Sequence, residues 1–253
     1  MWIHNLNPVL IEIFSLEIRY YGLVYVLGFL FAIWWMQKYR REIGLNKEEV
    51  YDFIFYVMLG LIIGSRLFHV VFWDFSYYFF QPWKIFYLWE GGMAFHGGLV
   101  GSILVSWWYC KIKKVNFLKV ADLISIPAAF ALALGRVANF INAEVVGRVT
   151  GVAWAVDFGD AQARHPYQIY AALKRFFVGG VLIYFFTKKL KEGFIFFSLV
   201  FLLGVGRFVL DFYREDILYF GFSVGQWMSL IMVIVSGIIL IKKYKKSLRK
   251  VFK

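Results

Sequence analysis

The sequence lacks most of the groups that soluble enzymes use for chemistry. Its 253 residues include a single cysteine, so no internal disulfide can form. There is no His-x-x-x-His or Cys/His cluster of the kind that binds zinc, and no Gly-x-Ser-x-Gly nucleophile motif. A phosphate loop and a dinucleotide-binding fingerprint are also missing. We therefore expect neither a metal site nor a bound cofactor.

Polar segments are scarce too, and apolar residues dominate. The chain is 61% hydrophobic and 22% aromatic, and its mean hydropathy is +0.66. A helix needs about 20 apolar residues to cross the hydrocarbon core of a bilayer. The sequence predicts an all-α polytopic membrane protein with about seven transmembrane helices, or six because two spans are short, in a single integral-membrane domain over residues 1–253. The predicted spans lie near residues 18–37, 51–72, 95–110, 118–135, 172–187, 194–212 and 221–241.

Acidic residues are few, with 16 Asp and Glu against 28 Lys and Arg. Eighteen of the 28 basic residues lie on alternate connections and on the C-terminal tail, in the segments 38–47, 111–119, 188–191 and 242–253. The positive-inside rule then predicts an outside N-terminus and an inside C-terminus. This alternation indicates membrane topology and contact with anionic lipid, not binding of nucleic acid. The longer polar connections fall outside, so we expect small loop elements and the working face of the protein there.

Five polar or charged side chains are predicted on that outer side, in a shared lipid-accessible cavity. A bilayer tolerates such groups poorly, so their presence on one side indicates a functional site. The five residues are His96, Arg136, Asn139, Glu144 and Arg207.

His96 is a candidate general base. It lies in the segment 91–101, where five of the eleven residues are glycine and allow a ligand to approach the backbone closely. The ordinary imidazole pKa of about 6.5 suits proton transfer near neutrality. The alternative is a structural histidine at the start of a helix, bonded to a neighbouring carbonyl.

Two arginines in the apolar spans suit an anion. If the helix of the fourth span continues past Arg136, Asn139 lies near it on the helix surface, and together they offer fixed donors for a phosphate. Glu144 would orient Arg136 or bind a substrate hydroxyl, and the alternative is an internal Arg136–Glu144 pair. Arg207 has Asp211 four residues further on, so a local ion pair is its alternative role.

Two longer motifs make the chain similar to one family. They are His96-Gly97-Gly98-Leu99 and Gly135-Arg136-x-x-Asn139-Phe140-Ile141-Asn142-x-Glu144-x-x-Gly147-Arg148. With these motifs the chain resembles the prolipoprotein diacylglyceryl transferases. Shorter matches follow in the family's order over nearly the whole chain: Tyr21-Gly22, Trp154-Ala155, His165-Pro166-x-Gln168-x-Tyr170, Arg207-Phe208 and Gly225-Gln226-x-x-Ser229.

The resemblance implies an enzyme of lipoprotein biosynthesis that transfers the diacylglyceryl group of phosphatidylglycerol to the lipobox cysteine thiol of preprolipoproteins. A thioether forms and glycerol phosphate leaves. The implied place is the cytoplasmic membrane, with the active site towards its extracytoplasmic face, and the implied partners are these two substrates and membrane lipids, without a metal or cofactor. The implied catalytic residues are His96, Arg136 and Arg207. The implied substrate-binding residues are Tyr21, Gly97, Gly98, Asn139, Asn142, Glu144 and Gly147.

Three positions depart from the family's pattern. Ala171 stands where glutamate is common, Asp211 where glutamate is usual, and Leu203 where some members carry tyrosine. These departures leave open a related transferase that uses another glycerolipid donor, such as an ether lipid. An anion transporter that uses the intramembrane arginines is an alternative of another class, and an inactive paralogue that only binds lipid is a third.

Overall fold

Long helices make up most of the chain. The computed structural model of the protein describes residues 2–14 and 16–251. Six of its helical segments are long and apolar enough to cross a membrane, which confirms the all-α polytopic fold. They are α1 (Tyr20–Ile43), α2 (Lys47–Phe72), α5 (Phe117–Ile141), α6 (Tyr167–Thr187), α7 (Phe194–Leu210, extended to Tyr213 by η3) and α8 (Val224–Lys243).

The third predicted span, near residues 95–110, forms the 19-residue helix α4 (Phe95–Lys113). It is not among the six helices that meet the criteria of length and hydropathy. A seventh crossing therefore stays a prediction.

Short elements connect the long helices. Three two-stranded sheets pair β1 (Trp2–Ile3) with β4 (Val156–Asp157), β2 (Val9–Ile13) with β3 (Leu16–Arg19), and β5 (Leu218–Tyr219) with β6 (Phe222–Ser223). The remaining elements are α3 (Phe75–Phe80), η1 (Pro82–Phe86), η2 (Leu88–Glu90), η3 (Asp211–Tyr213) and α9 (Lys245–Val251).

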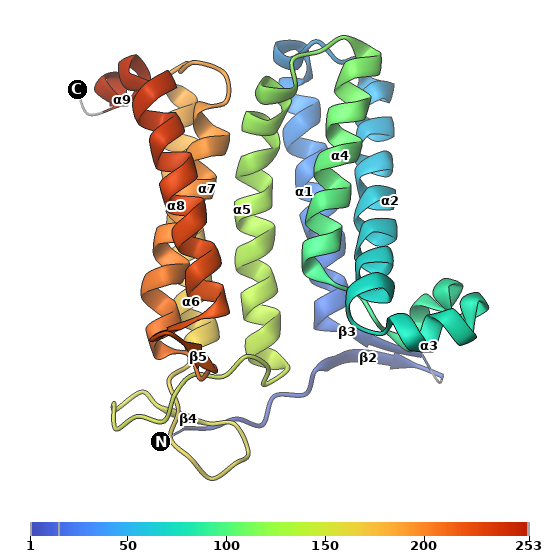
Figure 1. The fold of residues 1–253 in the computed structure, drawn as a ribbon, viewed down its shortest axis with the longest axis vertical. Helices are drawn as coiled ribbons and strands as arrows, with labels where there is room; N and C mark the ends of the chain where they lie inside the picture. Colours follow the sequence, from blue (N-terminus) through green and yellow to red (C-terminus); the bar gives the residue numbers. More distant parts are fainter. Residues whose placement is uncertain (1, 15, 252–253) are drawn as a thin grey trace. The chain divides into compact units, whose positions relative to one another are not determined.

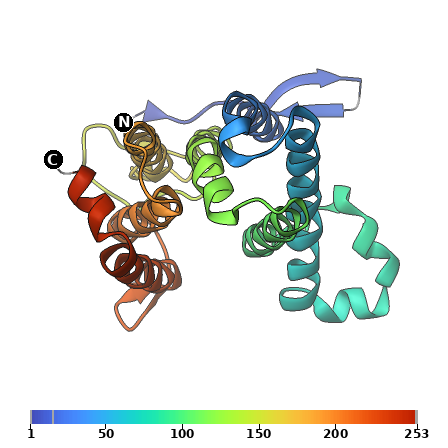
Figure 2. The ribbon, with the colours of Figure 1, turned by 90° about the horizontal axis from the view of Figure 1, so that it is seen from above.

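The chain forms two compact units, each with its own packing. The larger unit comprises the residues up to Ala32 together with those from Ala121 onward, and the smaller comprises Ile33–Val120. Within the larger unit, α7 and α8 run side by side (Figures 1 and 2). A Cβ on Gly204 of α7 would lie 3.0 Å from Val233 Cγ2 of α8, so this glycine permits the close approach. Asp122 of α5 accepts backbone hydrogen bonds from Gly193 and Phe196, at 2.6 and 2.8 Å, and so satisfies the start of α7.

In the smaller unit, α2 and α4 pack through facing glycines. A Cβ on Gly64 of α2 would lie 3.0 Å from Gly101 Cα of α4, and one on Gly60 would lie 2.8 Å from the Gly101 carbonyl oxygen. Gly97 and Gly98 are buried in the same contact, against Phe68 and Ser65 respectively. Small residues four apart on each helix allow such contact in a bilayer, where apolar burial alone does not drive helices together.

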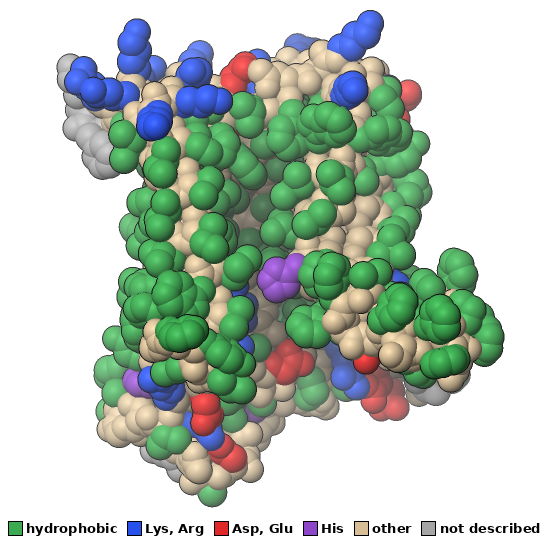
Figure 3. All heavy atoms as spheres, in the orientation of Figure 1, with side chains coloured by type: hydrophobic (Ala, Val, Ile, Leu, Met, Phe, Trp, Pro, Cys, Tyr) green, Lys and Arg blue, Asp and Glu red, His purple; other side chains and the backbone are tan. Residues whose placement is uncertain are grey.

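Charge is distributed along the helices of the larger unit as expected for a membrane protein. Hydrophobic side chains cover the middle of these helices, and Lys and Arg side chains gather where α8 runs into α9 (Figure 3). The ends that carry Arg136 and Arg207 lie at the opposite end of this helix bundle (Figure 1).

Candidate functional site

Arg136 and Asn139 lie in the last two turns of α5. The guanidinium Nη1 of Arg136 donates to Asn139 Oδ1 at 3.2 Å, and Asn139 Nδ2 donates to Glu144 Oε2 at 2.9 Å. Asn139 is buried, so its amide is held in place between the two charged groups. Of the described residues, no carboxylate lies within ion-pair distance of Arg136, so its positive charge has no local counter-ion.

The segment after α5 corrects two expectations about Glu144. Helix α5 ends at Ile141 and does not continue through Glu144. The chain turns instead, with φ of +55° at Ala143 and +56° at Val145. Glu144 therefore does not follow the helical spacing from Arg136, and the alternative of an internal Arg136–Glu144 pair is not formed. Its carboxylate accepts from the Asn139 amide and, at 3.2 Å, from Asn142 Nδ2, so Asn142 joins the same cluster.

Two further contacts fix this turn. Gln168 of α6 is fully buried and its Nε2 donates to the Glu144 carbonyl oxygen at 2.7 Å. Gly147 donates its backbone N–H to the His165 carbonyl at 3.2 Å, and a Cβ there would lie 2.8 Å from the Tyr213 carbonyl oxygen. Gly147 is thus required for close backbone packing, and its predicted role in substrate binding stays a prediction.

Arg207 forms an ion pair with Asp211, which is the alternative role that the sequence suggested for this arginine. Arg207 Nε lies 3.3 Å from Asp211 Oδ2, and the carboxylate, which is 1% exposed, also accepts from the Tyr167 hydroxyl. The Arg207 side chain remains 37% exposed. A Cβ on Gly225, in the first turn of α8, would lie 2.5 Å from Arg207 Nη2, so the absence of a side chain there makes room for the guanidinium.

These groups form one cluster within the larger unit. The charge of Arg136 interacts with those of Arg207 and Arg214 and with the phenols of Tyr167 and Tyr21. Tyr21, at the start of α1, packs against Tyr25 with ring centroids 5.5 Å apart. The structure thus brings together Tyr21, Arg136, Asn139, Asn142, Glu144 and Arg207.

Sequence reasoning missed two cations of this unit, Lys174 and Arg175 of α6. The predicted span began near residue 172, which put both basic residues at its very start, whereas α6 begins at Tyr167 and both lie two turns inside the helix. Arg175 is 9% exposed, and Lys174 is partly buried. Two adjacent basic residues inside an otherwise apolar run were the available signal.

The polar loop before α6 is held by its own ion pairs. Arg164 is buried and binds Asp160 at 2.6 Å through Nε, and Glu215 through Nη1. The hydrogen bond from Arg164 holds the pKa of Asp160 below its usual value. His165 Nδ1 lies 3.2 Å from the Tyr170 hydroxyl, and burial lowers the pKa of His165.

His96 belongs to the smaller unit, in the first turn of α4. Its side chain is exposed and contacts the rings of Phe68 and Phe95, with centroids 6.1 and 5.8 Å away. Within the described part of the chain no carbonyl accepts a hydrogen bond from its ring, so the alternative of a histidine bonded to a carbonyl is not what the structure has.

Arg66 of α2 organises the loop that leads to His96. It is 3% exposed, and its guanidinium donates to carbonyl oxygens in η1 and in the turns on either side of η2. The acceptors are the carbonyls of Lys84, Ile85, Tyr87, Gly91 and Gly92. A buried guanidinium with this many acceptors fixes the path of the backbone before α4.

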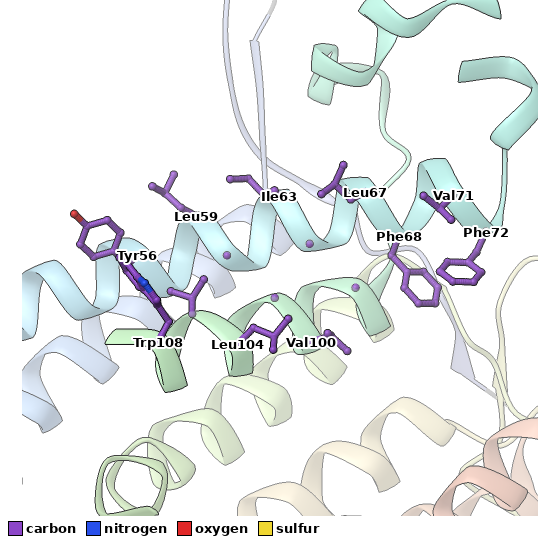
Figure 4. Close-up of a pocket in the computed structure, with 15 residues that line it drawn as sticks. Tyr56, Leu59, Ile63, Leu67, Phe68, Val71, Phe72, Val100, Leu104 and Trp108 are labelled. Atoms are coloured by element: carbon purple, nitrogen blue, oxygen red, sulfur yellow. The ribbon is translucent and has the colours of Figure 1, made fainter. Parts of the chain in front are cut away.

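An apolar groove of about 560 Å³ runs along α2 and α4 of the smaller unit (Figure 4). Leu59, Ile63 and Leu67 line it from α2, and Leu104 lines it from α4. Phe68, which contacts His96, also lines the groove. Such a lining suits a hydrocarbon chain.

Fold and site together define a multi-pass membrane protein with a cationic site at one end of its larger helix bundle. Among the residues that the structure describes, His, Cys, Asp and Glu form no group of three or more that could hold a metal ion. The cations of the larger unit suit an anionic ligand, and the groove of the smaller unit suits a hydrocarbon chain.

Comparison with known proteins gives the family. The family model of prolipoprotein diacylglyceryl transferase matches residues 8–242. Phosphatidylglycerol–prolipoprotein diacylglyceryl transferases from Idiomarina loihiensis and Vibrio cholerae are each 40% identical to this chain, covering 96% of it and 95% and 94% of their own lengths. The Geobacter sulfurreducens protein of that name is 38% identical over 91% of this chain and 93% of its own length. The chain belongs to the prolipoprotein diacylglyceryl transferase family, and it is a transferase.

Proposed function

We propose that this protein transfers the diacylglyceryl group of phosphatidylglycerol to the lipobox cysteine thiol of preprolipoproteins. The names of its relatives state phosphatidylglycerol and prolipoprotein as their substrates. The structural observation that carries the proposal is the arrangement of Arg136 and Arg207. Arg136 has no carboxylate partner among the described residues, and Arg207 lies near enough for the two charges to interact. Two cations at the end of apolar helices suit the phosphate of a lipid headgroup.

The reaction requires a thiolate and a stabilised leaving group. The substrate thiol has an ordinary pKa of about 8.5 and must lose its proton before its sulfur attacks carbon. His96 takes that proton. The sulfur forms a C–S bond to the glycerol carbon, the C–O bond to phosphate breaks, and its electrons remain on the phosphate oxygen of the departing glycerol phosphate. Arg136, Asn139 and Arg207 donate to that oxygen group as its negative charge grows.

The remaining predicted residues bind and position the donor. Glu144 holds the Asn139 amide, Asn142 donates to the Glu144 carboxylate, and the two position the headgroup. Tyr21 lines the lipid site. Gly97 and Gly98 place His96 by allowing α4 to approach α2 closely. The apolar groove beside Phe68 would accept an acyl chain.

We further place the protein in the cytoplasmic membrane, as a single functional domain with its site towards the extracytoplasmic face. The family match crosses both compact units, which supports one functional domain. In the larger unit the site lies opposite the basic helix ends that the positive-inside rule puts in the cytoplasm. Ala171, Asp211 and Leu203 keep an ether-lipid donor as the second candidate.

The test is turnover by the purified protein in detergent micelles with phosphatidylglycerol and a lipobox peptide. Mass spectrometry should detect a peptide that is heavier by one diacylglyceryl group. Arg136→Ala should abolish turnover, whereas Arg19→Ala, at an exposed arginine paired with Glu17, should leave it unchanged. In His96→Gln the remaining rate should rise with pH towards about 8.5, because the substrate thiol then ionises unaided. Absence of product with ester and ether donors alike, while a known family member works in parallel, would refute the proposal.

A further inference from the structure

Lys174 and Arg175 are two adjacent cations inside a membrane-spanning helix. They lie seven and eight residues after the start of α6 at Tyr167, which corresponds to about 10–12 Å along the helix. Of the described residues, no carboxylate lies within ion-pair distance of either one. Charged side chains at such a position are unfavourable unless something pairs with them, and they commonly mark a ligand site.

Arg175 has an incomplete set of partners. Its Nη1 donates to the Ala171 carbonyl oxygen at 3.0 Å, one turn earlier on the same helix. Its Nε is buried and has no hydrogen-bond partner within the described part of the chain. The guanidinium stays protonated at any physiological pH, so a buried positive charge with an unused donor remains.

Lys174 extends this charge towards the candidate site. Its methylene groups pack over Gly206 of α7, and its Nζ makes one long contact, 3.5 Å, with the Leu203 carbonyl oxygen. Its ammonium interacts with the charges of Arg136, Arg175, Arg207 and Asp211, and Arg175 interacts with the same outer arginines. Four basic side chains and the buried carboxylate of Asp211 therefore interact in one region.

We propose that Lys174 and Arg175 extend the phosphate site of the proposed transferase reaction and bind the phosphate monoester that the reaction releases. This rests on the proposed function for the identity of the ligand. A phosphodiester headgroup carries one negative charge, whereas a phosphate monoester carries about 1.5 to 2 at pH 7. Two cations beyond Arg136 and Arg207 therefore favour the product, and the transition state that leads to it, over the bound donor.

Position 171 supplies a matched test. Ala171 is buried one turn before Arg175, and its carbonyl oxygen accepts the hydrogen bond from Arg175 Nη1. A carboxylate there would stand four residues before Arg175, on the same helix face, and would neutralise it. The alanine thus leaves the charge of Arg175 available to a ligand.

Binding of glycerol phosphate to the purified full-length protein in detergent tests the proposal by calorimetry. Lys174→Gln and Arg175→Gln should each weaken binding about tenfold or more, since hydrogen bonds to charged groups are lost. Ala171→Glu should bind more weakly than Ala171→Gln, which has the same size without the charge. Lys188→Gln, at the opposite helix end, should bind like wild type. For turnover, Lys174→Gln should lower kcat more than it raises KM for the donor, and Lys174→Arg should restore kcat.

Equal binding of glycerol phosphate by wild type, Lys174→Gln and Arg175→Gln would overturn the proposal, even with normal turnover. Equal binding by the two Ala171 variants would also count against it, and this comparison does not depend on whether Lys174→Gln and Arg175→Gln fold. If wild type fails to turn over phosphatidylglycerol but binds glycerol phosphate in a manner that depends on Lys174 and Arg175, the transferase assignment fails and the anion site stands.

Discussion

Gly225→Ala should displace Arg207 without unfolding the protein. The added Cβ would lie 2.5 Å from Arg207 Nη2 and 2.7 Å from Asp211 Oδ2. Ordinary contacts of this kind are about 3.5 Å, so the guanidinium must move by about 1 Å. A shift of that size at a reacting group lowers the rate by about 10²-fold, which corresponds to about 2.7 kcal/mol in the activation free energy. We therefore expect kcat/KM for phosphatidylglycerol to fall by about two orders of magnitude.

Stability separates this effect from misfolding. Alanine is a better helix former than glycine by about 1 kcal/mol, so the thermal unfolding temperature in detergent should change little. Gly180→Ala is the matched control, because a Cβ at that helical position of α6 has no atom within 4 Å. It should keep wild-type kcat/KM. If Gly225→Ala keeps full kcat/KM as well, the position of Arg207 does not control the reaction and the reasoning is wrong.

Three further predictions concern stability and charge. Asp211→Asn removes the buried charged partner of Arg207 and should lower the free energy of unfolding by about 1–3 kcal/mol, a modest loss because the Arg207 side chain is partly exposed. Chemical denaturation measures this loss, and an unchanged midpoint would contradict the prediction. Gly101→Val should separate α2 from α4 and destabilise the smaller unit by about 1–3 kcal/mol, seen as earlier thermal exposure of Cys110 to a thiol reagent. Burial lowers the pKa of His165, so the folded protein resists protonation of this side chain and its stability should fall as the pH drops through about 6.5. The unfolding temperature should therefore fall less between pH 8 and pH 5 in His165→Phe than in wild type. Equal falls in the two proteins would contradict this.

The parts of the fold that depend on continuous helices were predictable from sequence. Long apolar runs fixed the membrane helices to within a few residues at most ends. The Arg207–Asp211 pair followed from their spacing, because the helical backbone continues from one residue to the other. The start of α6 was missed by five residues, so Lys174 and Arg175 stood at the end of the predicted span although they lie two turns inside the helix.

Features that depend on turns or on a second helix were not predictable. The chain leaves the helix at Ile141 and adopts positive φ at Ala143 and Val145, which are residues that rarely do so and give no signal in the sequence. Helical spacing therefore misplaced Glu144. The packing role of Gly97 could be recognised only with the facing helix α2 in view.

The two arginines of the larger unit are held by different chemistry, and this difference suits a division of labour. Arg207 is fixed by a buried carboxylate that itself accepts from Tyr167, so its position is defined while much of its charge is neutralised locally. Arg136 is fixed by the neutral amide of Asn139, and the carboxylate of Glu144 acts one step away by orienting that amide. Arg136 thus keeps a full charge for an anion that binds and leaves, whereas Arg207 keeps its geometry. An aspartate in place of Asn139 would hold Arg136 more tightly and still impair the enzyme, because the charge that the phosphate needs would already be paired.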